Sequence, residues 1–255
     1  MSILEKFSLK GRIALVSGGA GPMFGSSISE ALAEAGATLI SASRSLERNE
    51  EFAERLVEEG YEAHALELDI TEPDSIEAVS AKVLERFGRL DVLVNSAVVA
   101  RGGGFEEQTA EYWDYSARGN MVGLFAMCKA FVPDMQQRGW GRVVAITSAA
   151  VREPIPQLIL SNTARSGLTG FLKTTAREVA SDGVTVNSVQ PGIHATDRMG
   201  QLYDDLDGLA ATIPSGTVGD PADFGRVVAF LCSEPARFIT GAALPVDGGA
   251  VHGLQ

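Results

Sequence analysis

The sequence predicts an α/β fold, in which a doubly wound parallel sheet of seven strands carries helices on both faces. Short apolar segments alternate with longer segments of helical periodicity along almost the whole chain. The short segments are mostly apolar, which is typical of strands that a parallel sheet buries on both faces. No linker or internal repeat interrupts the alternation, so we expect a single domain over residues 1–255.

The apolar runs place the strands, and the 3.6-residue periodicity places the helices between them. We predict strands over residues 13–16, 37–43, 64–68, 90–95, 142–146, 184–189 and 242–246. We predict helices over residues 26–37, 46–59, 74–87, 110–138, 160–180 and 221–232. Ser27 and Glu30 have the spacing of a capping box at the start of the first of these helices.

The segment over residues 193–217 is polar and has no clear periodicity. Right-handed crossovers give a doubly wound sheet, and the ligand of such a sheet lies beyond the carboxyl ends of the strands. Because the segment leaves the carboxyl end of the sixth strand, we expect it to form a lid rather than a disordered loop.

Composition excludes several classes of protein. The net charge is −12 and no run of Lys or Arg occurs, which argues against nucleic-acid partners and anionic membrane surfaces. The two cysteines, Cys128 and Cys232, belong to no metal-binding spacing, so we expect no metal. The N-terminus does not resemble a signal peptide, and no uncharged apolar run reaches the about 18 residues that span a bilayer. We therefore expect a cytoplasmic protein.

The stretch over residues 12–37 combines a strand, a glycine-rich turn and the start of a helix. The turn runs from Gly18 to Gly25, and its missing Cβ atoms let a ligand approach the backbone closely. Free N–H groups and the helix dipole favour an anion at this place. The stretch therefore predicts the phosphate seat of a Rossmann-type dinucleotide site, although an ordinary strand-to-helix turn has the same local pattern.

The end of the second strand indicates which dinucleotide binds. A site for NAD(H) usually has an acidic residue here for the ribose 2′-hydroxyl. This chain has Ser43 followed by Arg44, and a hydroxyl with a guanidinium suits a 2′-phosphate. We therefore expect NADP(H) in preference to NAD(H).

Further motifs occur in a characteristic order. They are Asp69 with Ile70, the turn Asn95–Ser96–Ala97, the helix motif Trp113–Asp114 with Asn120, Ser148 after the fifth strand, Pro191–Gly192 with Thr196, and the ending Thr240–Gly241 with Asp247–Gly248–Gly249. With the glycine turn, this series resembles the short-chain dehydrogenase/reductase family over nearly the whole chain. The resemblance implies a carbonyl-reducing or alcohol-oxidising activity on a small molecule. The cofactor residues that it and the glycine turn imply are Ser17, Gly18, Gly19, Gly21, Phe24, Gly25, Ser43, Arg44, Asp69, Ile70, Asn95, Ser96, Ala97, Arg165, Pro191, Gly192, Ile193 and Thr196.

The catalytic set departs from the family pattern. The resemblance implies roles for Asn120 in a proton relay and for Ser148 at the carbonyl oxygen. The family's Tyr position, thirteen residues after Ser148, holds Ser161, and its Lys position holds Arg165. An aliphatic hydroxyl is a much weaker acid than a phenol of pKa about 10, and Arg does not exchange its proton near neutral pH.

Another group therefore has to supply the proton. His194 follows Pro191–Gly192, next to the place where the resemblance puts the nicotinamide, and His transfers protons well near neutral pH. A loop histidine without a catalytic role is the interpretation of His194 that we prefer, and water is the other candidate donor. The glycine turn is also one residue longer than the family's usual turn.

Three functions stay open on the sequence alone. The first is an NADP(H)-dependent oxidoreductase with an altered proton relay, which we favour because Ser148 and Asn120 are present. The second is a cofactor-binding homologue without redox turnover, and the third is a lyase or isomerase that uses the same pocket. The helices around Asn120 and over residues 160–180 resemble the family's dimerising helices, which implies a homodimer or homotetramer.

Overall fold

Seven parallel strands form one sheet in the computed structural model, which describes residues 2–99, 101–202 and 205–253. The strands are β1 (Ile13–Ser17), β2 (Thr38–Ser43), β3 (Ala63–Glu67), β4 (Val92–Asn95), β5 (Gly141–Ile146), β6 (Val184–Pro191) and β7 (Ala243–Val246). Their order is β3-β2-β1-β4-β5-β6-β7. The order reverses between β1 and β4, and a crevice for ligands opens at such a reversal in doubly wound sheets. The predicted fold class is confirmed.

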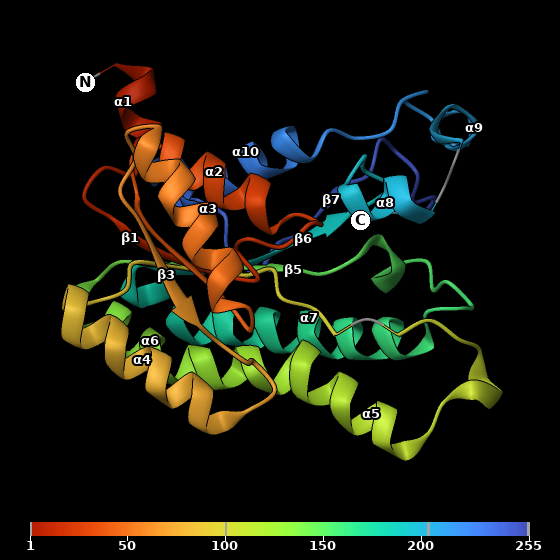
Figure 1. The fold of residues 1–255 in the computed structure, drawn as a ribbon, viewed down its shortest axis with the longest axis horizontal. Coiled ribbons are helices and arrows are strands. Elements are labelled where there is room, and N and C mark those ends of the chain that lie inside the picture. Colours follow the sequence, from red (N-terminus) through yellow and green to blue (C-terminus); the bar gives the residue numbers. More distant parts are fainter. Residues whose placement is uncertain (1, 100, 203–204, 254–255) are drawn as a thin grey trace.

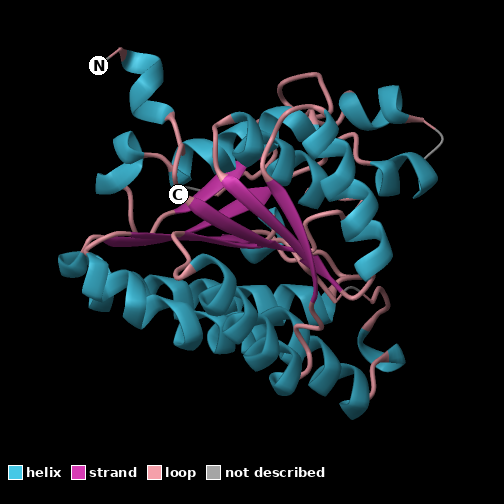
Figure 2. Ribbon diagram, turned by 60° about the vertical axis from the view of Figure 1, so that its left-hand side comes forward, coloured by secondary structure: helices cyan, strands magenta, loops and turns pink. Residues whose placement is uncertain are grey.

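Helices cover both faces of this sheet (Figure 1). One layer contains α4 (Pro73–Phe87), α5 (Ala110–Ala117), α6 (Gly123–Arg138) and α7 (Ile159–Val179). The other contains α2 (Gly25–Glu34), α3 (Leu46–Glu58) and α10 (Pro221–Cys232). Figure 2 shows the sheet between these two helical layers.

The core divides along the sheet because successive side chains of a strand point to opposite faces. In β1, Leu15 packs with the layer of α4, α6 and α7, whereas Ala14 and Val16 pack with the layer of α2, α3 and α10. All three side chains are fully buried. Burial on both faces explains why β1, β4 and β5 are mostly apolar, whereas β6 also buries the polar side chains of Asn187 and Gln190.

The predicted helix over residues 110–138 is not one uniform helix. A π-helical turn over Arg118–Val122 separates α5 from α6. Within it, the Asn120 side chain binds both the N–H and the C=O of Val99, at 3.1 and 2.8 Å. A wider turn lets the helix keep this bond to the loop after β4 while α5 and α6 continue on either side. Periodicity alone does not reveal such a turn, because the apolar spacing on both sides stays helical.

The segment over residues 193–217 contains more regular structure than we predicted. Two short helices, α8 (Asp197–Leu202) and α9 (Leu206–Ala210), interrupt it. Residues 203 and 204 lie outside the described part of the chain. A further helix, α1 (Ile3–Phe7), was not predicted from the sequence. A capping box of Ser2 and Glu5 starts it, and none of its residues is buried.

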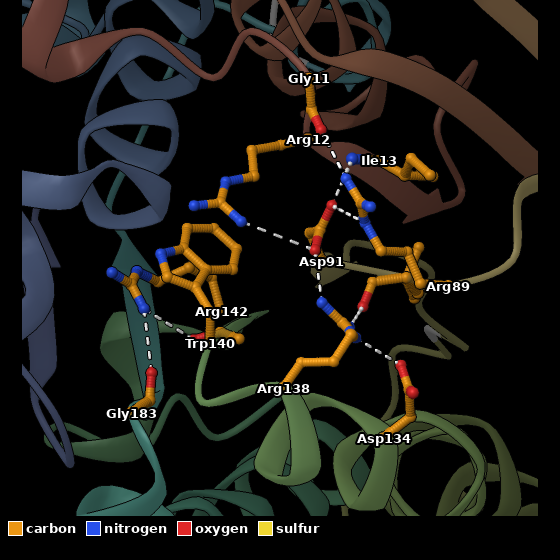
Figure 3. Close-up of polar contacts among 12 residues, drawn as sticks. Gly11, Arg12, Ile13, Arg89, Asp91, Asp134, Arg138, Trp140, Arg142 and Gly183 are labelled. Atoms are coloured by element: carbon orange, nitrogen blue, oxygen red, sulfur yellow. Dashed lines mark hydrogen bonds and ion pairs between the residues drawn. The ribbon is translucent and has the colours of Figure 1, made fainter.

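The amino edge of the sheet holds a network of charged side chains around Asp91 (Figure 3). The Asp91 carboxylate is 0% exposed and lies 2.7 Å from Arg138 Nη1 and 3.1 Å from Arg89 Nε. It also accepts a hydrogen bond from the backbone N–H of Ile13, at 3.0 Å, and lies 3.8 Å from Arg12 Nη1. Asp91 thereby connects the amino ends of β1 and β4 with the end of α6.

Among the described residues, no helix combines the length and the apolar character that crossing a membrane requires. In the same part of the chain, no group of three or more His, Cys, Asp or Glu side chains is arranged to hold a metal ion.

Candidate active site

A pocket opens at the carboxyl edge of the sheet, between β1 and β4, where the strand order reverses. Its empty volume, including the open mouth, is about 850 Å³. Nine predicted cofactor residues line it, namely Gly18, Gly21, Gly25, Ser43, Arg44, Asp69, Ile70, Ser96 and Ala97. The other residues that line the pocket were not predicted as cofactor contacts. They are Pro22, Met23, Leu68, Thr71, Val98, Val99 and Tyr115.

The glycine turn forms the floor of this pocket. Gly18 has a φ angle of +71°, a left-handed backbone conformation that residues other than glycine rarely adopt. A Cβ atom at this position would lie 3.0 Å from the Ala97 backbone. A Cβ on Gly25 would collide with the Gly18 carbonyl oxygen. The turn can therefore close only with glycine at these two positions, and the backbone is left open to a ligand.

The first turn of α2 faces this floor without a side-chain cap. Phe24 is the N-cap residue, and no side chain accepts a hydrogen bond at this end of the helix. The predicted capping box is wrong, because α2 begins at Gly25, two residues before Ser27, and Glu30 instead pairs with Arg55. The Ser26 N–H donates to the Gly21 carbonyl oxygen at 3.3 Å, and the other N–H groups of this first turn, which no side chain caps, are available for an anion such as a phosphate.

The end of β2 presents one cation to the pocket. Among the described residues that line it, only Arg44 and Asp69 carry charge. Arg44 Nη1 donates to the phenolic oxygen of Tyr115, on α5, at 3.3 Å. The Ser43 hydroxyl donates a hydrogen bond to the amide oxygen of the buried Asn49, at 3.0 Å, so the hydroxyl hydrogen of Ser43 points into the protein. Arg44, rather than Ser43, therefore faces a ligand with its donors.

Asp69 and Ile70 form the part of the wall that follows β3. The Asp69 carboxylate accepts hydrogen bonds from the backbone N–H and the hydroxyl of Thr71, at 2.9 and 2.7 Å. These bonds close a tight turn and hold Ile70 between them. The apolar Ile70 side chain and the neighbouring Leu68 give this wall a surface on which a flat ring can pack.

Ser17 and Asn95 lie behind the pocket rather than in it. Both are buried, and the Ser17 hydroxyl donates to the Asn95 amide oxygen at 2.7 Å. The Ala97 N–H in turn donates to the Ser17 hydroxyl oxygen, at 3.3 Å. The pair ties the carboxyl ends of β1 and β4 together and sets the position of the Ser96–Ala97 turn. Gly19 is also a packing position, since a Cβ there would lie 2.7 Å from Ser41 Oγ.

Ser148 and Arg165 come together at the carboxyl end of β5. Arg165, on α7, donates from Nη1 to the carbonyl oxygens of Ile146 and Thr147, the two residues before Ser148. The Ser148 hydroxyl oxygen accepts from the Ala150 N–H at 3.1 Å, so its own hydrogen can be donated. Ser161 lies one turn before Arg165 on the same face of α7.

Burial changes the chemistry of Arg165. Desolvation lowers the pKa of its guanidinium to about 10, and its Nε atom is buried without a hydrogen-bond partner among the described residues. A buried donor without a hydrogen-bond partner is costly, and Arg165 is not among the residues that line the pocket between β1 and β4. At pH 7 the group still carries its charge, in a place where little water screens it.

His194 lies in an aromatic cluster beneath the glycine turn. Its ring packs edge-on against Phe24 and Phe224, with centroids 5.2 and 5.1 Å apart. Its Nδ1 lies 3.2 Å from the Gly192 carbonyl oxygen, which can only accept, so we assign the ring proton to Nδ1. Burial lowers the pKa of His194, and the ring is therefore neutral at pH 7. Neither His194 nor Phe24 is among the residues that line the pocket.

The remaining predicted cofactor residues follow the end of β6. The Gly192 N–H donates to Val246 in β7, and a Cβ on Gly192 would lie 2.7 Å from the Asp247 Cα. Thr196 is buried, and its hydroxyl accepts from the Met199 N–H at the start of α8. Pro191, Gly192, Ile193 and Thr196 thus lie at the same carboxyl edge of the sheet, but outside the pocket between β1 and β4.

These features together fit a ligand that carries phosphate groups and hydroxyls. The glycine floor and the uncapped α2 suit a pyrophosphate, and Arg44 suits a further anionic group. The Ser148 hydroxyl, whose hydrogen can be donated, suits a carbonyl oxygen further along the edge. A dinucleotide has this distribution of groups.

Comparison with known proteins agrees with this geometry. A model of the family described as Enoyl-(Acyl carrier protein) reductase matches residues 19–251. The chain is 36% identical over 243 residues to the 3-oxoacyl-(acyl-carrier-protein) reductase FabG of Vibrio cholerae, covering 95% of this chain and 98% of that protein. It is also 36% identical over 240 residues to the acetoacetyl-CoA reductase of Cupriavidus necator, covering 93% of this chain and 97% of the relative. A gluconate 5-dehydrogenase from Burkholderia cenocepacia, crystallised with NADP and tartrate, superposes with a TM-score of 0.92 at 28% identity and covers 99% of this chain and 100% of its own.

Proposed function

Because this chain belongs to the short-chain dehydrogenase/reductase family of nicotinamide-dependent oxidoreductases, we propose that it is an NADP(H)-preferring enzyme that reduces a carbonyl or oxidises an alcohol. One observation carries the proposal: the pocket at the reversal of strand order combines a glycine floor with Arg44 as its cation. The relatives named above act on 3-oxoacyl thioesters and on a sugar acid, according to their names. These two chemical classes are the first substrates to test.

We propose that Arg44 makes the protein prefer NADP(H) over NAD(H). A guanidinium binds a phosphate with paired, charge-assisted hydrogen bonds, whereas a ribose diol needs an acceptor. The carboxylate of Asp69, the other charged group of the pocket, is engaged by Thr71. The balance of donors and acceptors therefore supports NADP(H) over NAD(H).

Ser148 and Arg165 are the groups to which we assign the chemistry. A bound nicotinamide cofactor supplies or accepts the two electrons of the reaction as hydride. The Ser148 hydroxyl donates to the carbonyl oxygen of the substrate, and the Arg165 charge stabilises the negative charge that develops on that oxygen.

The proton that completes the alcohol comes, in this proposal, from water near Ser161 rather than from a side chain. Ser161 is too weak an acid to supply it, and Arg165 keeps its proton at pH 7 because its pKa is about 10. His194 is neutral and holds its Nδ1 proton toward Gly192, which favours a packing role. Asn120 acts as a positioning residue, because it clamps the Val99 backbone in the wall of the pocket.

The segment over residues 193–217 completes the proposed site as a lid. It leaves β6 at the carboxyl edge, and its helices α8 and α9 lie on that side of the sheet (Figure 1). Closure of a short helical segment over the substrate would exclude bulk water from the reaction.

Turnover with substrates of both classes tests this function. We expect NADPH to be oxidised with acetoacetyl-CoA or with a keto-sugar acid such as 5-ketogluconate. Ser148→Ala should lower kcat at least about a hundredfold while NADPH still binds, because the lost donor acts on the developing charge. Ser181→Ala, which changes an exposed serine far from the pocket, is the control.

The outcomes of this assay distinguish the alternative functions. NADPH binding without turnover on either class would favour a cofactor-binding homologue. Conversion of an alcohol or enol substrate without change in the NADPH absorbance would favour a lyase or isomerase. The double substitution Ser161→Tyr with Arg165→Lys supplies the family's usual acid, and a gain of reductase activity would show that the absent phenol limits the reaction.

A further inference from the structure

We infer that Tyr115 is a specificity-determining residue for the phosphorylated cofactor: it orients Arg44 and offers its own hydroxyl as a second donor to the 2′-phosphate. This inference rests on the NADP(H) preference proposed above and adds a second residue to that subsite. Nothing in the local sequence around Tyr115 suggests this role, since Tyr115 lies 71 positions after Arg44 on a different element.

The contact joins two walls of one pocket. Arg44 follows β2 and Tyr115 lies on α5, and both line the pocket between β1 and β4. Arg44 Nη1 donates to Tyr115 Oη at 3.3 Å. A free Arg side chain loses rotamer entropy when it binds a ligand, so a contact that holds it in place beforehand lowers that cost.

The chemistry of the phenol makes it more than a support. A phenolic oxygen that accepts from Arg44 still has its own hydrogen to donate. A phosphate offers only acceptors, and an O–H bond to a charged oxygen is among the stronger hydrogen bonds in proteins. Ser43, the other hydroxyl at this end of β2, directs its hydrogen to Asn49. Tyr115 therefore provides the hydroxyl that Ser43 does not.

The position of Tyr115 argues against a role in the core. Its side chain is 42% exposed, whereas Ser116, the next residue on α5, is buried. An aromatic ring this exposed contributes little to folding by burial. A residue that lines a pocket and contacts its cation is better explained by the ligand.

Tyr115→Phe tests the inference because it removes one oxygen and keeps the ring. We expect the Kd of NADPH, measured by fluorescence titration, to rise about threefold to tenfold, as the loss of one or two modest hydrogen bonds predicts. The Kd of NADH and kcat at saturating NADPH should not change. In an Arg44→Ala background, which removes the group that Tyr115 orients, the effect of Tyr115→Phe should be smaller.

The matched control is Tyr112→Phe, one turn earlier on α5. Its ring stacks against Arg101, with the guanidinium carbon 3.5 Å from the ring centroid, and it does not line the cofactor pocket. It should leave the ratio of the two Kd values as in the unmodified protein. If Tyr115→Phe leaves the ratio of the NADH and NADPH Kd values unchanged, or weakens the binding of both cofactors equally, the role of Tyr115 is overturned. The proposed preference for NADPH is not affected by that result. If the unmodified protein does not prefer NADPH, the proposed preference fails first and the inference fails with it.

Discussion

Arg165 carries a charge in a place where burial disfavours charge. Desolvation lowers its pKa to about 10, and the backbone carbonyls of Ile146 and Thr147 accept from only one of its nitrogens. A charge held this way, in poor solvent screening, acts strongly on a nearby oxyanion. The residue therefore has the electrostatic part of a catalytic role without the ability to transfer a proton.

His194 should make the stability of the protein depend on pH. Burial lowers its pKa below the ordinary value of about 6.5, so below that pH the unfolded chain binds a proton that the folded chain binds less readily. The free energy of unfolding should therefore fall as the pH drops through about 6.5. Urea titrations at pH 8.0 and 5.5 should show a smaller drop for His194→Gln, which keeps a donor for the Gly192 carbonyl.

A second histidine contributes in the same direction and needs its own variant. Burial and the neighbouring Arg86 lower the pKa of His64 as well. His64→Gln, titrated in parallel, separates the two contributions. Parallel pH profiles for the unmodified protein and His194→Gln would show that His194 is not shielded as described.

Gly25 should not tolerate a methyl group. Its Cβ would collide with the Gly18 carbonyl oxygen, so Gly25→Ala has to displace the glycine turn from the pocket. We expect NADPH affinity to fall at least about tenfold, which corresponds to about 1.4 kcal/mol. Gly170→Ala is the matched control, since a Cβ there meets open space on the surface of α7 and Ala favours a helix. Equal affinities of both variants for NADPH would contradict the described turn.

At the scale of single residues, the sequence predicted positions better than contacts. Arg44 was identified because it follows the second strand, Gly25 because it ends the glycine-rich turn, and Asp69 because it matches a motif of the family that the sequence resembles. It did not predict that Phe24 packs against His194, or that Tyr115 reaches Arg44. Those pairs lie far apart in the chain, and no local pattern encodes which side chains meet across a turn.

At the scale of the elements, the two edges of the sheet have different tasks. The carboxyl edge carries the pocket, and the amino edge carries the network around Asp91 (Figure 3). Near that network, Trp140 lies between Arg12 and Arg142, whose guanidinium carbons are 3.6 and 4.3 Å from its ring centroid. The amino edge thus joins strand ends through charge and stacking, away from the proposed chemistry.

Asp91→Ala should destabilise the protein without weakening cofactor binding. It leaves the backbone N–H of Ile13 and three arginines without their shared acceptor. Removing one partner of a buried ion pair costs about 3–5 kcal/mol, and we expect the lower value because the arginines are partly exposed. Chemical denaturation measures the loss, and NADPH titration should give an unchanged Kd.

The control for Asp91 is Asp134→Ala. Asp134 contacts Arg138 at 2.8 Å, but on the surface and within one helix. Such pairs contribute about 0–1 kcal/mol, so the variant should unfold almost as the unmodified protein does. A loss of equal size in both variants would mean that burial of Asp91 has no special weight.

Element order and type were predictable because buried strands and amphipathic helices have distinct periods. All seven strands and the helices that we predicted occur where expected, within a few residues at their ends. The π turn at Arg118–Val122 and the start of α2 at Gly25 were not predictable in the same way. Tertiary contacts of Asn120 and close backbone approach decide both, and neither leaves a periodic pattern.

At the scale of the whole molecule, one helical face is apolar and exposed. The π turn, α6 and α7 form a groove lined by Met121, Val122, Phe125, Gly167, Leu168 and Phe171. The side chains of Val122 and Phe125 are 50% and 46% exposed. With the family resemblance of these helices, this face supports our proposal that the protein forms a dimer or tetramer.

Phe125→Asp should reduce the oligomeric state. It places a charge in the apolar groove, where association would have to desolvate it. Sedimentation velocity should show a larger species for the unmodified protein than for the variant. Phe105→Asp, at a position that is 82% exposed and outside the groove, is the control. A monomeric unmodified protein, or a variant that sediments like it, would contradict this assembly.

The central claim is that the pocket between β1 and β4 binds a phosphorylated nicotinamide dinucleotide, and NADPH binding measured beside NADH binding tests it most directly. We expect saturable one-to-one binding of NADPH by fluorescence titration, at least about tenfold tighter than NADH, because NADH lacks one charge-assisted contact. We also expect Arg44→Ala to remove most of that difference. Failure of both cofactors to bind, or an equal affinity that Arg44→Ala does not change, would contradict the claim.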